Sequence, residues 1–415
     1  MASNVAIWTV AALATLGVLI RPFRWPEAVW AVLGAAVLLI TGLLPVADGL
    51  RAVGKGLDVY LFLIGMMLLS ETARREGLFD WAAAFAVNQA AGSPRRLFLL
   101  VYAVGVVVTA FLSNDATAVV LTPAVFAAAR KARADPAPHL FICALVANAA
   151  SFVLPISNPA NLVLYGDHMP PLGRWFASFA LPSLVAVIAT YGLLLWSQRA
   201  ALAGRCEVAV ERPRLSAGGW TALVGLVLTA SVLLIVSALD IKLGAPTFVM
   251  GGLTTAIVLA RGRASPMPLL RDVSWSVLPL VAGLFVMVEA LDRSGLTRAL
   301  AGLLRSGVAA STNLAAAAAA AAIALVSNLV NNLPAGLVAS ATLAQAQAPR
   351  KVVDALLIGV DLGPNLSITG SLATILWLTA IRREGEEVGF LAFLKVGALV
   401  MPPALALAIA ARLLI

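Results

Sequence analysis

The stretch "AFLSNDATAVVLTPAV" (residues 110–125) places Ser113, Asn114 and Asp115 in the middle of a strongly apolar run. A second stretch, "ALVSNLVNNLPAGLVAS" (residues 324–340), does the same with three asparagines. In hydrocarbon every backbone N–H and C=O needs an internal partner, so non-helical chain at depth survives only where protein or a water-filled cavity surrounds it. The two stretches therefore predict polar breaks buried inside a membrane protein.

Composition agrees with a membrane protein. The 415 residues are 61% hydrophobic and only 12% charged, with a mean hydropathy of +0.97, whereas soluble domains carry about 25% charged residues. Apolar stretches of about 18 to 25 residues recur along the chain, which suits helices that cross a hydrocarbon core. A β-barrel would instead show short segments of strict alternation. We predict an all-α, multi-pass protein of the cell (inner) membrane.

Several other classes of protein are excluded. The formal charge of +9 comes from arginine clusters that lie between the spans, where they report orientation, so no nucleic-acid partner is expected. The chain has no GxxxxGK[ST], HExxH or GxSxG motif, which argues against an enzyme. Its two cysteines, Cys143 and Cys206, exclude a disulfide framework and a cysteine metal cluster. We expect no cofactor and no bound metal.

The sequence also contains an internal repeat. Residues 65–83 match residues 283–301 at an offset of 218, through the pairs Gly65/Gly283, Glu71/Glu289, Arg75/Arg293, Gly77/Gly295 and Leu78/Leu296. The Ser-Asn pair at 113–114 matches 327–328 at an offset of 214, and residues 147–161 match 360–374 at 213. Three landmarks in one order predict a duplicated unit.

Charge sets the orientation of the two halves. The apolar run at 95–133 has basic residues at both ends, as expected of a hairpin whose polar tip enters the membrane from the cytoplasm. With ten spans and a second hairpin at 312–350, 19 Lys and Arg lie inside and 10 outside. The second hairpin then enters from the opposite face, which predicts inverted repeats. The alternative is that each hairpin forms two full spans, for twelve in all.

These observations predict a domain organisation. The expected parts are N-terminal scaffold spans (1–56), a first repeat (57–196) with a hairpin at 95–133 and an interrupted span at 138–165, a cytoplasmic connection (197–216), and a second repeat (217–415) with a hairpin at 312–350 and an interrupted span at 352–381.

The interrupted spans point to function. "VLPISNPANL" and "DLGPNLSITGSL" carry helix breakers at matching places in the two halves, and broken helices at equivalent positions mark the midplane site of a transporter. Asp115 and Asp361 are acids within the membrane, where a carboxylate can load and release a proton. We predict both to be proton-coupling residues, with Asp115 favoured. The alternative role for each is a helix N-cap.

Other polar and aromatic residues have structural interpretations. Glu71 and Glu289 each stand at a span end beside an arginine, which predicts a structural role. Interfacial anchoring is predicted for most of five tryptophans, namely Trp8, Trp25, Trp30, Trp175 and Trp377.

The motifs resemble the arsenical pump membrane protein (ArsB) family of the ion transporter superfamily. "SNDATAVVLTP" is similar to that family's first polar tip, "SNLVNNLPAGLV" to its second, and "GVDLGPNLSITGSLATILWL" (359–378) to its stretch near the last spans. The resemblance implies proton-driven efflux of trivalent arsenite and antimonite, and hence arsenical resistance. It further implies a scaffold and a moving transport domain in an elevator-like cycle, a homodimer, and in some systems a soluble arsenite-stimulated ATPase partner.

The resemblance also implies the residues that bind substrate. These are Ser113, Asn114 and Thr117 in the first tip, Asn328, Asn331 and Asn332 in the second, and Asn158, Asn161, Asn365, Thr369 and Ser371 in the interrupted spans. One departure is Asn148, which stands where its repeat partner is Asp361, so unequal coupling roles are expected for the two halves.

Alternative solutes remain. Arsenite at neutral pH is an uncharged trihydroxide, so amides and hydroxyls suit it, and Cys143 is expected to be a packing residue. A sodium- or proton-coupled carboxylate transporter keeps the same fold, although Asp115 would repel a dianion and neither tip contains Lys or Arg. Efflux of silicic acid, another neutral hydroxide, is the second alternative.

Overall fold

The computed structural model describes residues 2–166, 169–208, 210–211 and 213–415, and these residues form helices and connections without any strand. The first half contains α1 (Ala2–Ile20), η1 (Pro22–Arg24), α2 (Glu27–Ile40), α3 (Val46–Lys55), α4 (Leu57–Arg75), α5 (Leu78–Ala90), α6 (Pro94–Phe111), α7 (Asn114–Ala116), the π-helical turn η2 (Thr117–Leu121), α8 (Thr122–Lys131), α9 (Pro136–Ala149), η3 (Pro155–Ser157), α10 (Pro159–Tyr165) and α11 (Leu172–Ser197). The second half contains α12 (Ala217–Ala238), α13 (Gly244–Gly262), α14 (Pro266–Asp272), α15 (Val277–Arg293), α16 (Leu296–Ala310), α17 (Thr312–Val330), α18 (Asn332–Ala346), α19 (Arg350–Leu362), η5 (Gly363–Leu366), α20 (Leu372–Arg383) and α21 (Phe390–Leu414).

The helices include many that are long and apolar enough to cross a membrane. Six described helices meet this test alone, and eight do if each bent pair counts as one span. The bent pairs are α3 with α4, at 47°, and α14 with α15, at 41°. Two shorter apolar helices, α2 and α9, accompany them. The protein is thus an all-helical, multi-pass membrane protein.

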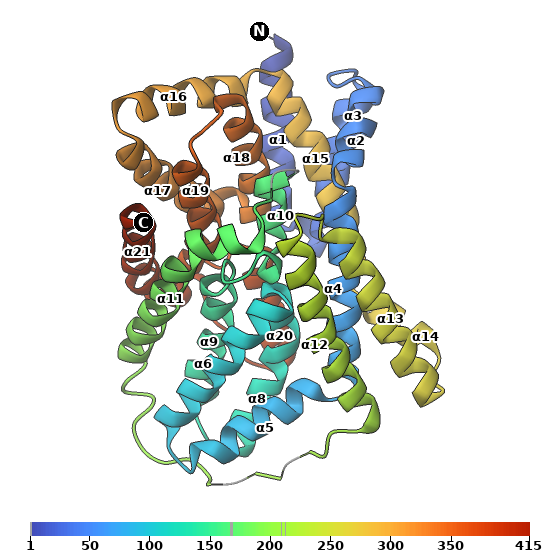
Figure 1. Cartoon of the computed structure of the whole chain (residues 1–415), viewed down its shortest axis with the longest axis vertical. Coiled ribbons are helices and arrows are strands. Elements are labelled where there is room, and N and C mark those ends of the chain that lie inside the picture. Colours follow the sequence, from blue (N-terminus) through green and yellow to red (C-terminus); the bar gives the residue numbers. More distant parts are fainter. Residues whose placement is uncertain (1, 167–168, 209, 212) are drawn as a thin grey trace.

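Elements in the same order in the two halves lie at opposite ends of the molecule (Figure 1). The short helix α3 lies in the upper half of the view and α14 in the lower half, while α5 lies at the lower end and α16 at the upper end. Both halves contribute to one continuous apolar core.

Two repeated glycines explain how the halves cross. A Cβ atom on Gly65 of α4 would lie 2.2 Å from the backbone oxygen of Thr247 in α13, and one on Gly283 of α15 would lie 2.7 Å from the oxygen of Ala31 in α2. Small residues allow membrane helices to approach backbone to backbone. Each glycine of the pair therefore packs a helix of one half against a helix of the other.

Two of the tryptophans predicted to be interfacial anchors are buried instead. The Trp175 indole donates to the backbone oxygen of Phe152 at 3.2 Å, and that of Trp377 donates to the oxygen of Leu140 at 2.8 Å. Both side chains are fully buried. The prediction is wrong for these two because a buried indole that finds an internal acceptor has no need of the interface.

Candidate functional site

The first polar stretch breaks the helix at Ser113. This residue has a φ of 140°, and its hydroxyl caps α7 by accepting from the backbone N–H of Ala116 at 3.4 Å. The Asn114 side chain accepts from the N–H of Asp115 at 2.9 Å, and the Thr117 hydroxyl lies 2.8 Å from that of Thr109. The amides and hydroxyls here thus satisfy backbone and side-chain groups that the break leaves free.

A π-helical turn follows this break. Pro123 lacks an N–H, so it cannot donate to the carbonyl of Val119 as an α-helix requires. The chain forms η2 directly before it, and the Thr122 hydroxyl donates to the oxygen of Thr117 at 3.2 Å. Single π turns inside helices are frequent at functional sites.

The second polar stretch breaks at Asn331, with a φ of 74°. Its side chain caps α18 by accepting from the N–H of Leu333 at 3.3 Å, and the N–H of Asn332 donates to the oxygen of Gly370 at 2.9 Å. Ser113 and Asn331 therefore have the same structural role, at the offset of 218. The predicted match of 113–114 to 327–328 is wrong, because the latter pair lies within α17, before the break.

In both halves a backbone oxygen near the end of the helix before the break accepts a hydrogen bond from a hydroxyl of a later segment, between α9 and α10 in the first half and between α19 and α20 in the second. Ser157 donates to the oxygen of Ala110 at 3.0 Å, and Thr369 donates to the oxygen of Asn328 at 2.9 Å. Free carbonyls at a helix C-terminus need such partners. The Asn328 amide donates to the oxygen of Gly363 at 3.0 Å.

Two sets of buried hydrogen bonds join the segment α9–α10 of the first half to the segment α19–α20 of the second. Asn158 donates to Asp361 at 2.8 Å, while Asn148 donates to Asn365 at 3.0 Å and to Thr374 at 3.3 Å. The Ser371 hydroxyl caps α20 and lies 2.8 Å from that of Thr374. These two sets of hydrogen bonds therefore include four residues predicted as site residues, Asn158, Asp361, Asn365 and Ser371.

Asn161 has a different set of partners. Its amide nitrogen donates to the backbone oxygens of Ser151, Leu154 and Pro155 at 2.9, 3.3 and 3.2 Å. Because carbonyls only accept, these contacts fix the nitrogen toward the η3 loop and point the Asn161 oxygen the other way.

Four buried side-chain oxygens around these breaks have no partner among the described residues. They belong to Asn148, Asn161, Asn332 and Asp361. All four are acceptors, and in most proteins such buried groups are paired with protein, water or ligand. A water or solute that reaches any of these oxygens would have to supply a hydrogen-bond donor.

One buried ion pair was not predicted. The Arg412 guanidinium holds Asp354 through contacts of 2.8 and 3.0 Å, and the Tyr165 hydroxyl donates to the same carboxylate. The pair links α10, α19 and α21. The two ionic residues stand 58 positions apart, so no local sequence pattern reveals them.

The acids Glu71 and Glu289, predicted to be structural, both form ion pairs. Glu71 binds Arg75 at 2.8 Å, and Glu289 binds Lys55 at 2.8 Å. In each case the helix end is joined to a charged neighbour, which agrees with the predicted role.

Comparisons with known proteins add a family context. The sequence profile of the citrate transporter family matches residues 9–364. The chain is 28% identical over 400 residues to an arsenical pump membrane protein of Escherichia coli, which covers 92% of each chain. It is 26% identical over 396 residues to an uncharacterized transporter of Mycobacterium tuberculosis, which covers 90% of each.

A solved structure has a similar fold. The YdaH transporter of Alcanivorax borkumensis superposes with a TM-score of 0.56 and covers 89% of this chain and 88% of that one, at 18% sequence identity. At this identity the likeness concerns the fold alone.

Proposed function

The chain belongs to the citrate transporter family of secondary membrane transporters, and we propose that it exports trivalent arsenite and antimonite in exchange for protons. Relatives named arsenical pump membrane protein, similar over 92% of the chain, support this choice of solute.

The observation that carries the proposal is the set of unpaired acceptor oxygens on Asn148, Asn161, Asn332 and Asp361. A solute that satisfies them must bring hydrogen-bond donors. Arsenite, an uncharged trihydroxide at neutral pH, brings three O–H groups and adds no charge to a buried site. It therefore complements these oxygens better than an anion does.

A carboxylate substrate fits these residues poorly. Ionised carboxylates only accept hydrogen bonds, so a carboxylate substrate cannot bond to the unpaired acceptor oxygens of these residues. The segments that form the breaks contain no Lys or Arg, across residues 97–129, 134–173, 306–349 and 352–381. A citrate-like anion would enter a buried site without a fixed counter-charge, at a large desolvation cost.

The transport cycle that we propose uses inverted repeats. In this proposal α6–α8 and α17–α18 are re-entrant hairpins, while α9–α10 and α19–α20 are interrupted spans. The equivalent caps at Ser113 and Asn331 support it, as do the opposite positions of α5 and α16. Substrate binds between the two breaks, and the hairpins move with the interrupted spans past the helices that carry Gly65 and Gly283, which form the scaffold.

Asp115 and Asp361 are the proposed proton carriers. The Asp115 side chain has no hydrogen bond or ion pair with a described residue, and one oxygen of Asp361 is unpaired. A carboxylate without a fixed counter-charge can bind a proton as substrate leaves. The position equivalent to Asp115 in the other half is Leu333, and the position equivalent to Asp361 is Asn148. Each proposed carrier therefore has a carboxylate in one half only.

Counterflow in proteoliposomes tests the substrate. Vesicles loaded with unlabelled arsenite or antimonite are expected to accumulate radiolabelled arsenite transiently, and vesicles loaded with citrate are not. Absence of arsenite counterflow, together with accumulation of labelled citrate by citrate-loaded vesicles, would contradict the proposal and favour the carboxylate transporter. Absence of arsenite counterflow together with counterflow of silicic acid would favour the other alternative.

A further inference from the structure

A small cavity of about 80 Å³ reaches the Asp115 side chain. It lies between α4, the first break, and the loop that joins α14 to α15. Ser113 and Asp115 line it on one side, and Glu71, Asp272 and Ser274 line it on the other. The cavity therefore connects the proposed proton carrier with the charged end of α4.

Two polar groups in this cavity have no partner among the described residues. One is the Ser70 hydroxyl, whose side chain is buried with 8% exposed, and the other is the Asp115 carboxylate. A cavity of this volume has room for water, and water needs polar partners of this kind. The Ser70 hydroxyl has one donor and two acceptor lone pairs, so it can bond on both sides at once.

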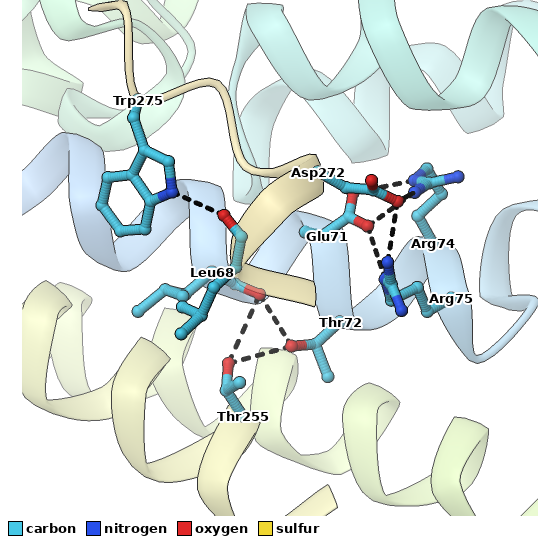
Figure 2. Close-up of polar contacts among 9 residues, drawn as sticks. Leu68, Glu71, Thr72, Arg74, Arg75, Thr255, Asp272 and Trp275 are labelled. Carbon is cyan, nitrogen blue, oxygen red and sulfur yellow. Dashed lines mark hydrogen bonds and ion pairs between the residues drawn. The ribbon is translucent and has the colours of Figure 1, made fainter. Parts of the chain in front are cut away.

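Glu71 and Asp272, which line the cavity, belong to an ion cluster with Arg74 and Arg75 (Figure 2). Arg74 and Arg75 bind Glu71 at 2.6 and 2.8 Å, and both also bind Asp272, at 2.9 and 2.7 Å. The Asp272 side chain is 47% exposed, whereas that of Glu71 is 9% exposed. The cluster fixes α14 against the end of α4.

The walls beside the cluster are also held in place. The Trp275 indole donates to the backbone oxygen of Leu270 at 2.6 Å, which fixes the loop carrying Ser274. On another side of α4, the Thr72 hydroxyl lies 2.9 Å from that of Thr255 and ties α4 to α13 (Figure 2). Thr72 does not line the cavity.

We propose that this cavity is the route by which protons pass between Asp115 and the solution at the α14 end, with the Ser70 hydroxyl as a relay. This inference rests on the proposed proton-coupled function. In one step a water accepts the proton of Asp115, the Ser70 oxygen accepts a proton from that water while its own O–H proton passes to the next water, and the carboxylate is left ionised. The anions Glu71 and Asp272 and the cations Arg74 and Arg75 are the charged groups at the outer end.

Two substitutions that are isosteric with each other, to valine and to threonine, test the relay. Proteoliposomes with an entrapped pH-sensitive dye report proton movement driven by an arsenite gradient, and arsenite exchange without a pH gradient reports substrate binding and the conformational cycle. Ser70→Val is expected to lower the proton flux about tenfold or more while exchange continues, and Ser70→Thr, which has the same shape with the hydroxyl, is expected to retain the flux. Thr72→Val, on the same helix but outside the cavity, is the matched control.

The outcomes separate this inference from the proposed function. If the native protein moves no protons with arsenite, the proposed function fails and the inference fails with it. If Asp115→Asn stops the proton flux but Ser70→Val leaves it unchanged, the function stands and the relay is overturned.

A labelling measurement does not depend on transport. In a chain with both native cysteines replaced by serine, the Ser70→Cys thiol is expected to react with a membrane-impermeant thiosulfonate from one side of the membrane only. Ser274→Phe, which places a bulky side chain in the lining of the cavity, is expected to prevent that reaction. A thiol that reacts from neither side would overturn the proposed water-filled route.

Discussion

Asn158 of the first half donates a hydrogen bond of 2.8 Å to Asp361 of the second, and the other oxygen of that carboxylate is unpaired. The position equivalent to Asp361 is Asn148, which bonds to Asn365 and Thr374. The halves therefore meet through an amide on one side and an acid on the other. At this pair of equivalent positions, only the second half has an ionisable side chain.

The first prediction concerns Asp361. In Asp361→Asn the side-chain oxygen can still accept from Asn158, so the purified protein is expected to keep its melting temperature. Loss of the ionisable group is expected to lower transport driven by a pH gradient about tenfold or more. Proteoliposome uptake measures the rate, and wild-type uptake in this variant would exclude Asp361 from coupling.

The second prediction concerns Asp115. Its side chain has no hydrogen-bond or ion-pair partner among the described residues, so Asp115→Asn is expected to leave folding intact. Proton-driven arsenite efflux is expected to be abolished, because the carboxylate that loads the proton is gone. Elution from a sizing column checks folding, and full activity of the variant would remove Asp115 from the mechanism.

A third prediction compares two adjacent glycines of α13. A Cβ atom on Gly251 would lie 2.2 Å from the backbone oxygen of Gly65, whereas one on Gly252 would meet nothing within 4 Å. Gly251→Val is therefore expected to force α4 and α13 apart, at a cost of about 1–3 kcal/mol or more. Thermal unfolding in detergent measures the loss. Equal melting temperatures for Gly251→Val and Gly252→Val would contradict the close crossing.

The fourth prediction concerns the thiols. Cys143 is fully buried in α9, and burial raises the pKa of the Cys206 thiol in the connection between α11 and α12. Neither cysteine is expected to bind arsenite during transport, so the double variant Cys143→Ser, Cys206→Ser should confer nearly the native resistance on a sensitive host. A sensitive phenotype, with normal amounts of protein in the membrane, would indicate thiol capture.

The sequence predicted the positions of the breaks better than it predicted which residues of the two halves are equivalent. Polar residues inside apolar runs located the breaks at Ser113 and Asn331, because unpaired backbone needs such groups in a membrane. The repeated Ser-Asn dipeptide misled the alignment, since the cap position depends on a backbone conformation that different residues can adopt. Ser113 and Asn331 both have a positive φ, of 140° and 74°, although their side chains differ.

Contacts between segments that are distant in the sequence could not be predicted from it. The Arg412–Asp354 pair and the cavity at Ser70 both arise from helices that meet only in the folded chain. The burial of Trp175 and Trp377 could not be predicted for a similar reason, because an apolar helix that faces lipid and one that faces the core have similar compositions. Local patterns located the polar breaks, and tertiary packing decided their neighbours.

The most direct test of the account is uptake of radiolabelled arsenite into everted membrane vesicles, with and without an imposed pH gradient. In such vesicles the former cytoplasmic face is outside, so an exchange for protons drives arsenite inward when the interior is acidic. Proton-coupled efflux predicts accumulation that requires the acidic interior and collapses when a protonophore is added. Accumulation of arsenite that does not depend on the pH gradient would contradict proton-coupled arsenite efflux. So would the absence of accumulation in vesicles that contain the folded protein.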